Sequence, residues 1–401
     1  MTTPPAPADL YRAPNALAPD YSRFRVDERL LLTGHSHQAW PDVGLAAQQQ
    51  AWLDAAERVD EKWPLAEAQA ERVRDGWRRL LGEPRAAIAL GQNTHELVTR
   101  LLSALPLDRR PRLLTTDAEF HTIRRQLDRL AEAGLDVRRV AGRPVETLAE
   151  RLAAAVDDRT ACCLVSSVQF ETAAIVPHLG LVADACAHHG AACLIDAYHH
   201  LNVVPFDIGT MRLEEAFIVG GGYKYCQLGE GNGFLRVPPG CDLRPVLTGW
   251  FAEFGALDRT GPRGGVEYGA GAARFAGATY DPTAHYRAAA VFDFHAARGL
   301  TPALLREVSR HQVGLLDAAF SACDADPALA RVEPLSAEGR GGFLAIRSPH
   351  AADLCAALRA RDVLADCRGD VLRLGPAPYL TDEQLGDAAA RLAEAVAELA
   401  Q

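Results

Sequence analysis

The spacing of apolar residues divides the chain into three regions. In residues 1–80, apolar positions recur every three or four residues over 43–59 and 67–81, which predicts two amphipathic helices behind an irregular start. Residues 81–285 instead alternate short apolar runs with helical stretches. We therefore expect an N-terminal arm with helices, followed by a large domain that is built around a sheet.

The large domain shows the pattern of repeated strand, helix, strand units. Apolar runs of strand length alternate with helical segments such as 145–156 and 179–189. Right-handed crossovers between such strands build a mostly parallel sheet, which predicts the α/β fold class with helices packed against the sheet. The expected strands include 112–116, 161–166, 191–195 and 216–220.

Residues 286–401 form the third region, which is rich in helical patterns. A helical segment leads to a short strand over 342–347, and a second strand is expected over 371–374. Helices are expected over 351–360 and 381–399, the latter capped by the Thr381 hydroxyl. This region predicts a small α+β domain.

Composition limits the kinds of partner that the protein can bind. The chain has 401 residues and 48% hydrophobic content, which suffices for a large core. Its net charge of -10 disfavours nucleic acid or an anionic membrane surface as the main partner. No apolar run reaches the roughly 18 residues of a membrane span, and the start lacks a basic stretch followed by an apolar one. The nine cysteines contain no Cys-x-x-Cys pair, so we expect reduced thiols and a cytoplasmic protein.

Two residues at the ends of expected strands carry the main chemical prediction. Asp196 follows the apolar run 191–195, and Lys224 follows the run 216–220 within the sequence Gly-Gly-Gly-Tyr-Lys-Tyr. Parallel strands bring their carboxyl ends to one sheet edge, where α/β proteins bind ligands. Pyridoxal phosphate needs a lysine that holds it covalently and an acid that keeps its ring nitrogen protonated. The pair therefore predicts a pyridoxal phosphate site with Lys224 and Asp196 as catalytic residues.

Three motifs together resemble the kynureninases. They are Asp-Ala-Tyr-His at 196–199, Gly-Tyr-Lys-Tyr at 222–225 and Gly-Trp-Phe at 249–251. This family belongs to the fold type I pyridoxal phosphate enzymes, close to the class V aminotransferases. The resemblance implies a seven-stranded-type sheet in the large domain and a homodimer with shared active sites. It also implies hydrolysis of the Cβ–Cγ bond of a kynurenine-type amino acid, which gives an anthranilate-type acid and alanine.

The resemblance also assigns residues to the cofactor. Asn93 and Thr94 open an expected helix whose free amides suit a phosphate. Phe120 matches the residue that stacks on the pyridine ring, and Tyr223 matches a tyrosine that reaches the phosphate and serves as the candidate proton mediator. The other implied cofactor-binding residues are Thr122, Ser166, Asp196, His199, Lys224, Trp250 and Thr279, with Thr279 coming from a second subunit.

The expected substrate-binding residues lie in two segments. Arg373, on the expected strand 371–374, resembles the arginine that binds the substrate α-carboxylate through a guanidinium fork. The segment Thr33 to Gln38 departs from the family pattern, and its His35 and His37 are candidates for a substrate-facing or a structural loop. Two histidines without a third ligand at a recognisable spacing do not predict a metal site.

Other functions remain open at this stage. A class V aminotransferase shares the lysine and the aspartate. A cysteine desulfurase or selenocysteine lyase requires a nucleophilic cysteine on a small-domain loop, for which Cys323, Cys355 and Cys367 are the candidates. A binding or regulatory protein on the same fold is a third possibility, because fold does not fix function.

Overall fold

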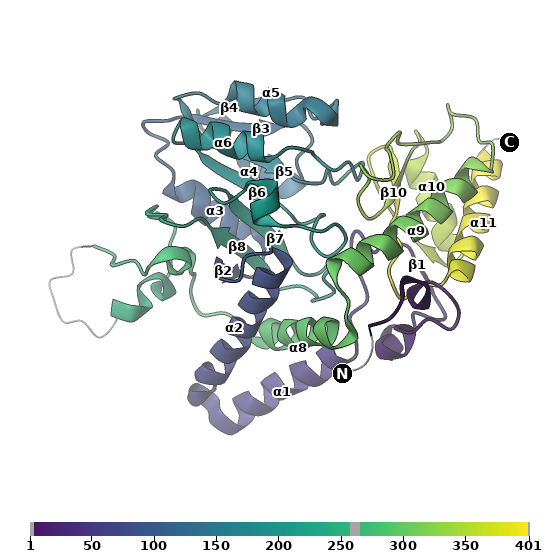
Figure 1. Cartoon of the computed structure of the whole chain (residues 1–401), viewed down its shortest axis with the longest axis horizontal. Helices are drawn as coiled ribbons and strands as arrows, with labels where there is room; N and C mark the ends of the chain where they lie inside the picture. The colour runs from purple at the N-terminus through teal and green to yellow at the C-terminus, as the bar shows by residue number, and fades with distance from the viewer. Residues whose placement is uncertain (1–3, 257–264, 400–401) are drawn as a thin grey trace.

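A seven-stranded mixed sheet forms the centre of the larger part of the computed structural model, which describes residues 4–256 and 265–399 (Figure 1). Its strand order is β2-β8-β7-β6-β5-β3-β4, and within the described residues only β8 runs antiparallel to its neighbours. The predicted α/β class with a mostly parallel sheet is therefore confirmed. The strands are β2 (Ala87–Gly91), β3 (Arg112–Thr116), β4 (Asp136–Val140), β5 (Thr160–Ser166), β6 (Ala192–Asp196), β7 (Phe217–Gly221) and β8 (Gly233–Val237).

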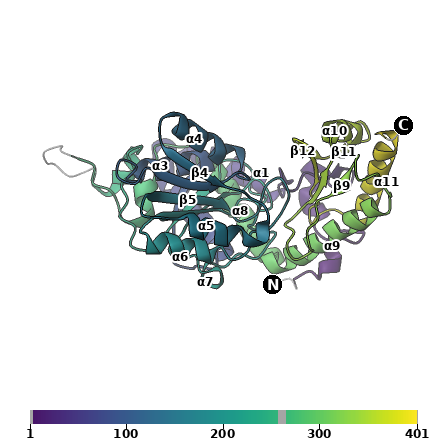
Figure 2. The same cartoon turned by 90° about the horizontal axis from the view of Figure 1, so that it is seen from above.

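Helices cover both faces of this sheet (Figure 2). One face packs against α3 and α4, and the other against α2, α5, α6 and α8, with a separate apolar cluster on each side. The interior strand β5 is buried along its whole length, as expected for a parallel strand between two helical layers. These helices are α2 (Trp63–Leu80), α3 (Thr94–Ala104), α4 (His121–Glu132), α5 (Leu148–Ala155), α6 (Gly180–His188) and α8 (Thr283–Arg298), with the short α7 (Ile208–Met211) before β7.

The C-terminal part contains a four-stranded antiparallel sheet in the order β12-β13-β10-β9. Its apolar core is closed by α9 and α11, which pack against each other, and by α10. The elements are α9 (Pro302–Ser321), β9 (Arg331–Val332), β10 (Leu344–Arg347), α10 (Ala351–Ala360), β12 (Asp366–Arg368), β13 (Val371–Leu374) and α11 (Asp382–Leu399). The domain boundaries at 80 and 285 stay a prediction.

The N-terminal residues divide between the two parts of the molecule. β1 (Leu30–Leu31) pairs in parallel with β11 (Val363–Leu364), and the apolar residues before it join the core of the C-terminal part. The following helix α1 (Val43–Arg58) packs instead along α8. Short 3-10 helices complete the fold: η1 (Pro7–Leu10), η2 (Ala18–Phe24), η3 (Val59–Lys62), η4 (Val145–Thr147), η5 (Trp250–Ala256) and η6 (Gly271–Phe275).

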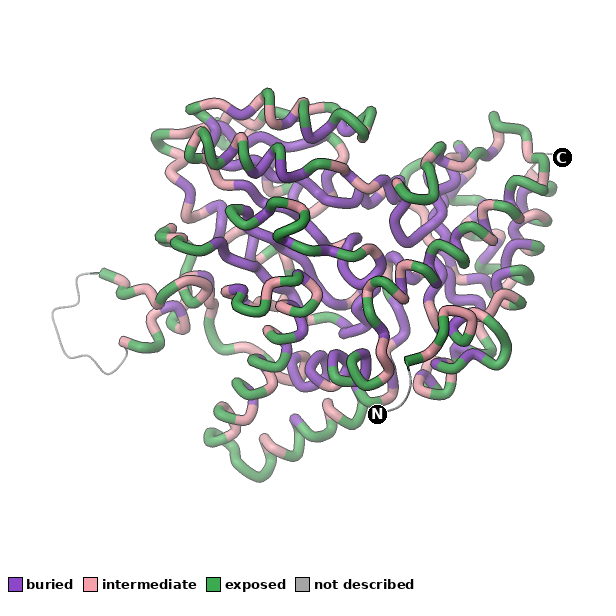
Figure 3. The backbone as a smooth tube through the Cα atoms, in the orientation of Figure 1, coloured by how far each residue is buried: buried purple, intermediate pink, exposed green. Residues whose placement is uncertain are grey.

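Burial follows this architecture. The strands of the large sheet and the inner faces of the helices are buried, whereas the outer side of α1 is exposed (Figure 3). Of the helices that the structure describes, none is both long and apolar enough to span a bilayer.

Candidate active site

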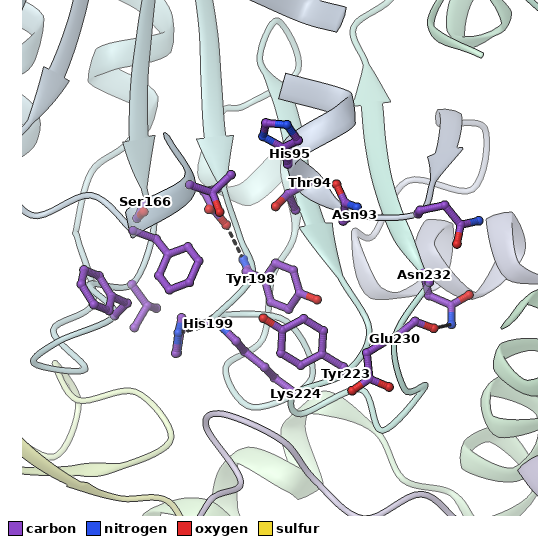
Figure 4. A pocket seen from close by; sticks show the side chains of 17 residues that line it. Asn93, Thr94, His95, Ser166, Tyr198, His199, Tyr223, Lys224, Glu230 and Asn232 are labelled. Carbon is purple, nitrogen blue, oxygen red and sulfur yellow. Dashed lines mark hydrogen bonds between the residues drawn. The ribbon is translucent and has the colours of Figure 1, made fainter. Parts of the chain in front are cut away.

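A pocket of about 360 Å³ lies at the carboxyl ends of the parallel strands. Ser166 and Asp196 are the last residues of β5 and β6, and the loop after β7 brings in Tyr223 and Lys224. The structure thus gathers nine predicted residues around one cavity (Figure 4). They are Asn93, Thr94, Phe120, Thr122, Ser166, Asp196, His199, Tyr223 and Lys224.

Lys224 is the one lysine of this pocket. Its side chain is buried, and its Nζ lies 2.7 Å from Nε2 of His199. Burial lowers the pKa of Lys224 to about 7, although the nearby Asp196 carboxylate opposes this shift. The sequence contains only one other lysine, Lys62, which lies in η3 against the ring of Trp63. An amine that is partly neutral near pH 7 can act as a nucleophile and as a base.

Asp196 is buried opposite this lysine at the end of β6. Its Oδ1 accepts a hydrogen bond from the backbone N–H of Tyr198 at 2.8 Å. Burial raises the pKa of Asp196, while that hydrogen bond and the charge of Lys224 act in the opposite direction. A buried carboxylate gains most from a cationic partner, so its environment suits a protonated ring nitrogen.

Glu119, which the sequence did not single out, lies directly behind the pocket wall. Its Oε2 accepts from the Ser166 hydroxyl at 2.6 Å, and its Oε1 accepts from the Ser166 N–H at 3.1 Å and from the Thr116 hydroxyl at 2.8 Å. Burial raises the pKa of Glu119 to about 7 despite these bonds. Since Ser166 pairs with Asp196 in the sheet, this carboxyl lies one strand away from the site acid.

The N-terminus of α3 forms another side of the pocket. The Asn93 side chain caps the helix by accepting from the Glu96 N–H at 3.0 Å, and the neighbouring Thr94 and His95 also line the cavity. Asn93 therefore combines a capping role with a place in the pocket. Free amides and the positive end of the helix favour an anion here.

Aromatic rings surround the lysine. The ring centroids of Tyr198, Phe120 and Tyr223 lie 4.5, 5.2 and 5.7 Å from Nζ of Lys224. Tyr198 lies against the backbone of Gly221, where a Cβ would come within 2.5 Å of its hydroxyl oxygen. Tyr198 belongs to the Asp-Ala-Tyr-His motif, so that motif was a signal for it that our prediction did not use.

Trp250 and Thr279 do not line the pocket of the single chain. Trp250 is 46% exposed and packs against Phe251 and Phe254, and Thr279 is exposed. Their assignment to the cofactor site remains a prediction, which for Thr279 involves a second subunit.

The predicted substrate residues lie beside the pocket, outside its lining. Arg373, on β13, donates to the backbone oxygen of Phe170, which does line the pocket. His37 stacks on the ring of Tyr223, with centroids 4.8 Å apart. His35 is fully buried and contacts Asp366 of β12. Sequence reasoning missed Asp366 because its partners become neighbours only through strand pairing.

The pocket residues fit pyridoxal phosphate. A buried lysine lies at its centre, an acid at one side and a helix N-terminus at another. The buried Nδ1 of His199 has no hydrogen-bond partner in the described residues, so a polar group is available towards a ligand. Volume, charge and donors thus agree with a phosphorylated pyridine.

The chain matches the model of one domain family and several known enzymes. Residues 305–392 match the family model of the kynureninase C-terminal domain. Isopenicillin N epimerase from Streptomyces clavuligerus is 28% identical over 368 residues, which cover 85% of this chain and 87% of that protein. Kynureninase from Bacillus thuringiensis subsp. konkukian is 28% identical over 258 residues, or 62% of this chain and 58% of that enzyme.

Solved structures share the fold over almost the whole chain. A lysine-to-alanine mutant of C-DES with glycine covalently linked to its pyridoxal phosphate cofactor superimposes with a TM-score of 0.81 at 18% identity, covering 94% of this chain and 98% of that one. Cysteine desulfurase from Thermococcus onnurineus NA1 gives 0.80 at 16% identity, with coverage of 96% and 99%.

The chain thus has the fold of these solved pyridoxal phosphate enzymes, and its pocket carries the lysine, the acid and the helix N-terminus that this cofactor requires. The predicted fold and cofactor are confirmed. Within this class the predicted resemblance to kynureninases is also confirmed, by the C-terminal domain match and by the kynureninases among the relatives.

Proposed function

We propose that this protein is a kynureninase-like hydrolase, which cleaves the Cβ–Cγ bond of a kynurenine-type amino acid. The observation that carries the proposal is the buried amine of Lys224 between His199 and the rings of Tyr198 and Tyr223. Water supplies a hydroxyl group to the acyl carbon and a proton to Cβ, so the products are an anthranilate-type acid and alanine. The kynureninase matches support this choice of reaction.

Each residue of the site has a role in this reaction. When bound, the cofactor supplies an electron sink for the carbanion that forms at Cα. Lys224 would hold the cofactor, and its neutral amine can remove the Cα proton of the substrate. Asp196 would keep the ring nitrogen protonated. Neutral His199 accepts a hydrogen bond from Nζ, because burial holds the pKa of this histidine well below its ordinary value.

Tyr223 is the candidate proton mediator at Cβ and the acyl oxygen. Burial raises the pKa of Tyr223, so its hydroxyl keeps its proton and can donate it. The ring of Tyr198 packs against that of Tyr223 at the pocket wall, with ring centroids 5.0 Å apart. This position beside Lys224 suits a group that moves a proton after the amine has taken one.

The cysteines do not favour a desulfurase. Cys367 is next to Asp366 on β12, and residues alternate between the two faces of a strand. Cys367 therefore packs with Cys355 into the apolar core, away from the face that carries Asp366 and Arg373. Cys323 lies just after the end of α9, and no cysteine lines the pocket in the described part of the chain.

Epimerisation at Cα is a second candidate. It is favoured by the match to isopenicillin N epimerase, which covers 85% of this chain against 62% for the kynureninase match. Epimerisation needs proton-carrying groups on both faces of Cα, and Lys224 and Tyr198 lie on different segments around the cavity.

One experiment separates these functions. We expect the cofactor-loaded protein to convert L-kynurenine or 3-hydroxy-L-kynurenine to equal amounts of an anthranilate-type acid and alanine, measured by mass spectrometry in D₂O. Deuterium at Cα together with inversion, without cleavage, would instead identify an epimerase. A pyridoxamine form of the cofactor after turnover would identify an aminotransferase.

We also propose that the active enzyme is a homodimer. Exposed apolar side chains gather on α1 and on the segment around η5, including Trp52, Leu53, Val246, Trp250 and Phe254. We expect a solution mass of twice the 43.2 kDa of one chain by light scattering. We also expect Trp250→Ala to weaken cofactor retention. A monomer that retains the cofactor fully would contradict the shared site.

A further inference from the structure

The segment Thr33 to Gln38 joins the two sides of the site. Thr33 forms a parallel bridge with Gly375, and the N–H of Gly34 donates to the Gly375 oxygen at 2.8 Å. At its other end the N–H of Gln38 donates to the backbone oxygen of Tyr223 at 3.3 Å. The segment therefore contacts both the end of β13 and the loop that carries the lysine.

His35 lies at the centre of this segment and is fully buried. A Cβ at Gly375 would come within 2.3 Å of its Nδ1, so glycine at that position allows the ring to pack closely. Its Nε2 lies 2.8 Å from Oδ1 of Asp366. Burial lowers the pKa of His35 to about 4, so the ring is neutral.

Asp366 links this ring to the substrate arginine. Burial opposes its charge, but hydrogen bonds from His35 and Arg373 outweigh that cost and hold the pKa of Asp366 far below its ordinary value. Since the carboxylate is ionised, Nε2 of the neutral His35 ring carries the hydrogen and donates a hydrogen bond to Oδ1 of Asp366. The histidine thus fixes Oδ1 of Asp366, the oxygen that also accepts from Nε of Arg373.

Arg373 is held by Asp366 along one edge of its guanidinium group. Nε donates to Oδ1 at 2.9 Å and Nη2 to Oδ2 at 2.6 Å, while Nη1 donates to the Phe170 oxygen at 2.6 Å. A guanidinium has five N–H groups, so one further N–H stays on each terminal nitrogen. Because Phe170 lines the pocket, this terminal edge lies next to the cavity.

We propose that His35 and Asp366 are positioning residues that hold Arg373 with its terminal edge directed to the pocket, where the α-carboxylate of an amino acid binds. This role depends on the proposed function in one respect, namely that the ligand is an amino acid with an α-carboxylate. The charge of Asp366 offsets that of the buried Arg373, so recognition depends on the geometry of the two remaining N–H groups.

His37 offers a matched control from the same segment. Its side chain is 62% exposed, and it contacts the Ser36 hydroxyl at 3.2 Å, the Tyr223 ring and Glu230 at 3.6 Å. It does not contact Asp366 or Arg373 in the described structure. A change at His37 therefore tests whether any disturbance of the segment has the same effect.

The test compares L-alanine with ethylamine, which lacks the carboxylate, as titrants of the cofactor absorbance band in the loaded enzyme. We expect His35→Leu to weaken the binding of L-alanine roughly tenfold and to leave ethylamine unchanged, because one hydrogen bond to a charged group is lost. His35→Gln should return the affinity to within about threefold, since its amide can donate near the position of Nε2. His37→Leu should not change the ratio of the two affinities.

Asp366→Asn provides a second, nearly isosteric test if His35→Leu does not fold. We expect it to weaken the binding of L-alanine roughly tenfold, because an amide cannot accept along both bonds from Arg373. Tighter binding of L-alanine would show that Asp366 competes with the substrate carboxylate for the guanidinium group of Arg373, and would overturn the proposal. An equal loss for both titrants, or no loss in His35→Leu, would also overturn it. A protein that prefers L-alanine but does not cleave kynurenine would refute the proposed hydrolase alone.

Discussion

The two ends of the site are assembled from the chain in different ways. At the cofactor end, Ser166, Asp196 and Lys224 come from adjacent strands of one sheet and from the loops that follow them. At the substrate end, His35 and Arg373 meet across most of the length of the chain, through Asp366. The cofactor end is thus a product of one repeated unit, whereas the substrate end depends on the docking of separate segments. The first can be predicted from local motifs, and the second cannot.

The largest effect is expected at the cofactor end. Lys224→Ala should lower activity by at least about 10³-fold, because the attachment point and the base are lost together. Borohydride reduction followed by mass spectrometry should find the cofactor on residue 224 of the wild type and nowhere on the variant.

Lys62→Ala is the control, because it removes the other lysine of the chain and should leave the labelling at Lys224 unchanged. Cofactor fixed to the Lys224→Ala variant would show that Lys224 is not the attachment point.

A smaller and more selective effect is expected at the substrate end. Arg373→Gln should weaken the binding of L-alanine roughly 10- to 100-fold, as expected for the loss of charge-assisted hydrogen bonds, and leave cofactor attachment intact. Isothermal titration and the cofactor absorbance band measure the two properties separately.

Arg347→Gln serves as the matched control. Arg347 lies on β10 of the same sheet and is paired with Asp370 and Glu333, away from the pocket lining. If both variants lose the same affinity, stability of the sheet and not recognition by Arg373 would explain the result.

The smallest effect concerns Glu119 and appears as a pH dependence of stability. Its pKa of about 7 lies above the ordinary value of 4.5, so between these two pH values the folded protein binds more protons than the unfolded chain. The free energy of unfolding contributed by this group therefore falls as pH rises through that range. Glu119→Gln removes this loss.

Relative to the wild type, the free energy of unfolding of the cofactor-free variant should rise by roughly 3 kcal/mol between acidic pH and pH 8, measured by urea unfolding. A constant difference between the two proteins at all pH values would mean that Glu119 is already ionised, which would make it a fixed charge at the cofactor end.

The sequence predicted the sheet, and which residues gather at its carboxyl edge, for a physical reason. Buried parallel strands appear as continuous apolar runs, and the residue that follows each run must lie at the ligand-binding edge. Asp196 and Ser166 lie at the ends of β6 and β5 for this reason. Glu119 could not be predicted in this way, because it lies in the loop between β3 and α4, where no hydrophobic periodicity marks a residue as buried.

The substrate end could not be predicted in the same way. Asp366 and Arg373 face each other only through the antiparallel register of β12 and β13, which no short motif specifies. His35 was assigned to a substrate-facing or a structural loop, and its burial becomes visible only once Gly375 is placed beside it. Long-range pairing, not composition, determines which residues meet there.

The pairing of the first strand with the last part of the chain has a consequence for the order of synthesis. The N–H of Ala39 donates to the Tyr379 hydroxyl across 340 positions. Strand β1 likewise cannot pair until β11 has been synthesised. At roughly 5 to 20 residues per second, a ribosome needs on the order of 20 to 70 s to make that interval. During this time the large sheet can form, while the apolar residues around Leu30 have no partner strand. The strands that carry Ser166 and Asp196 are therefore complete before the segment that carries Asp366 and Arg373 has been made.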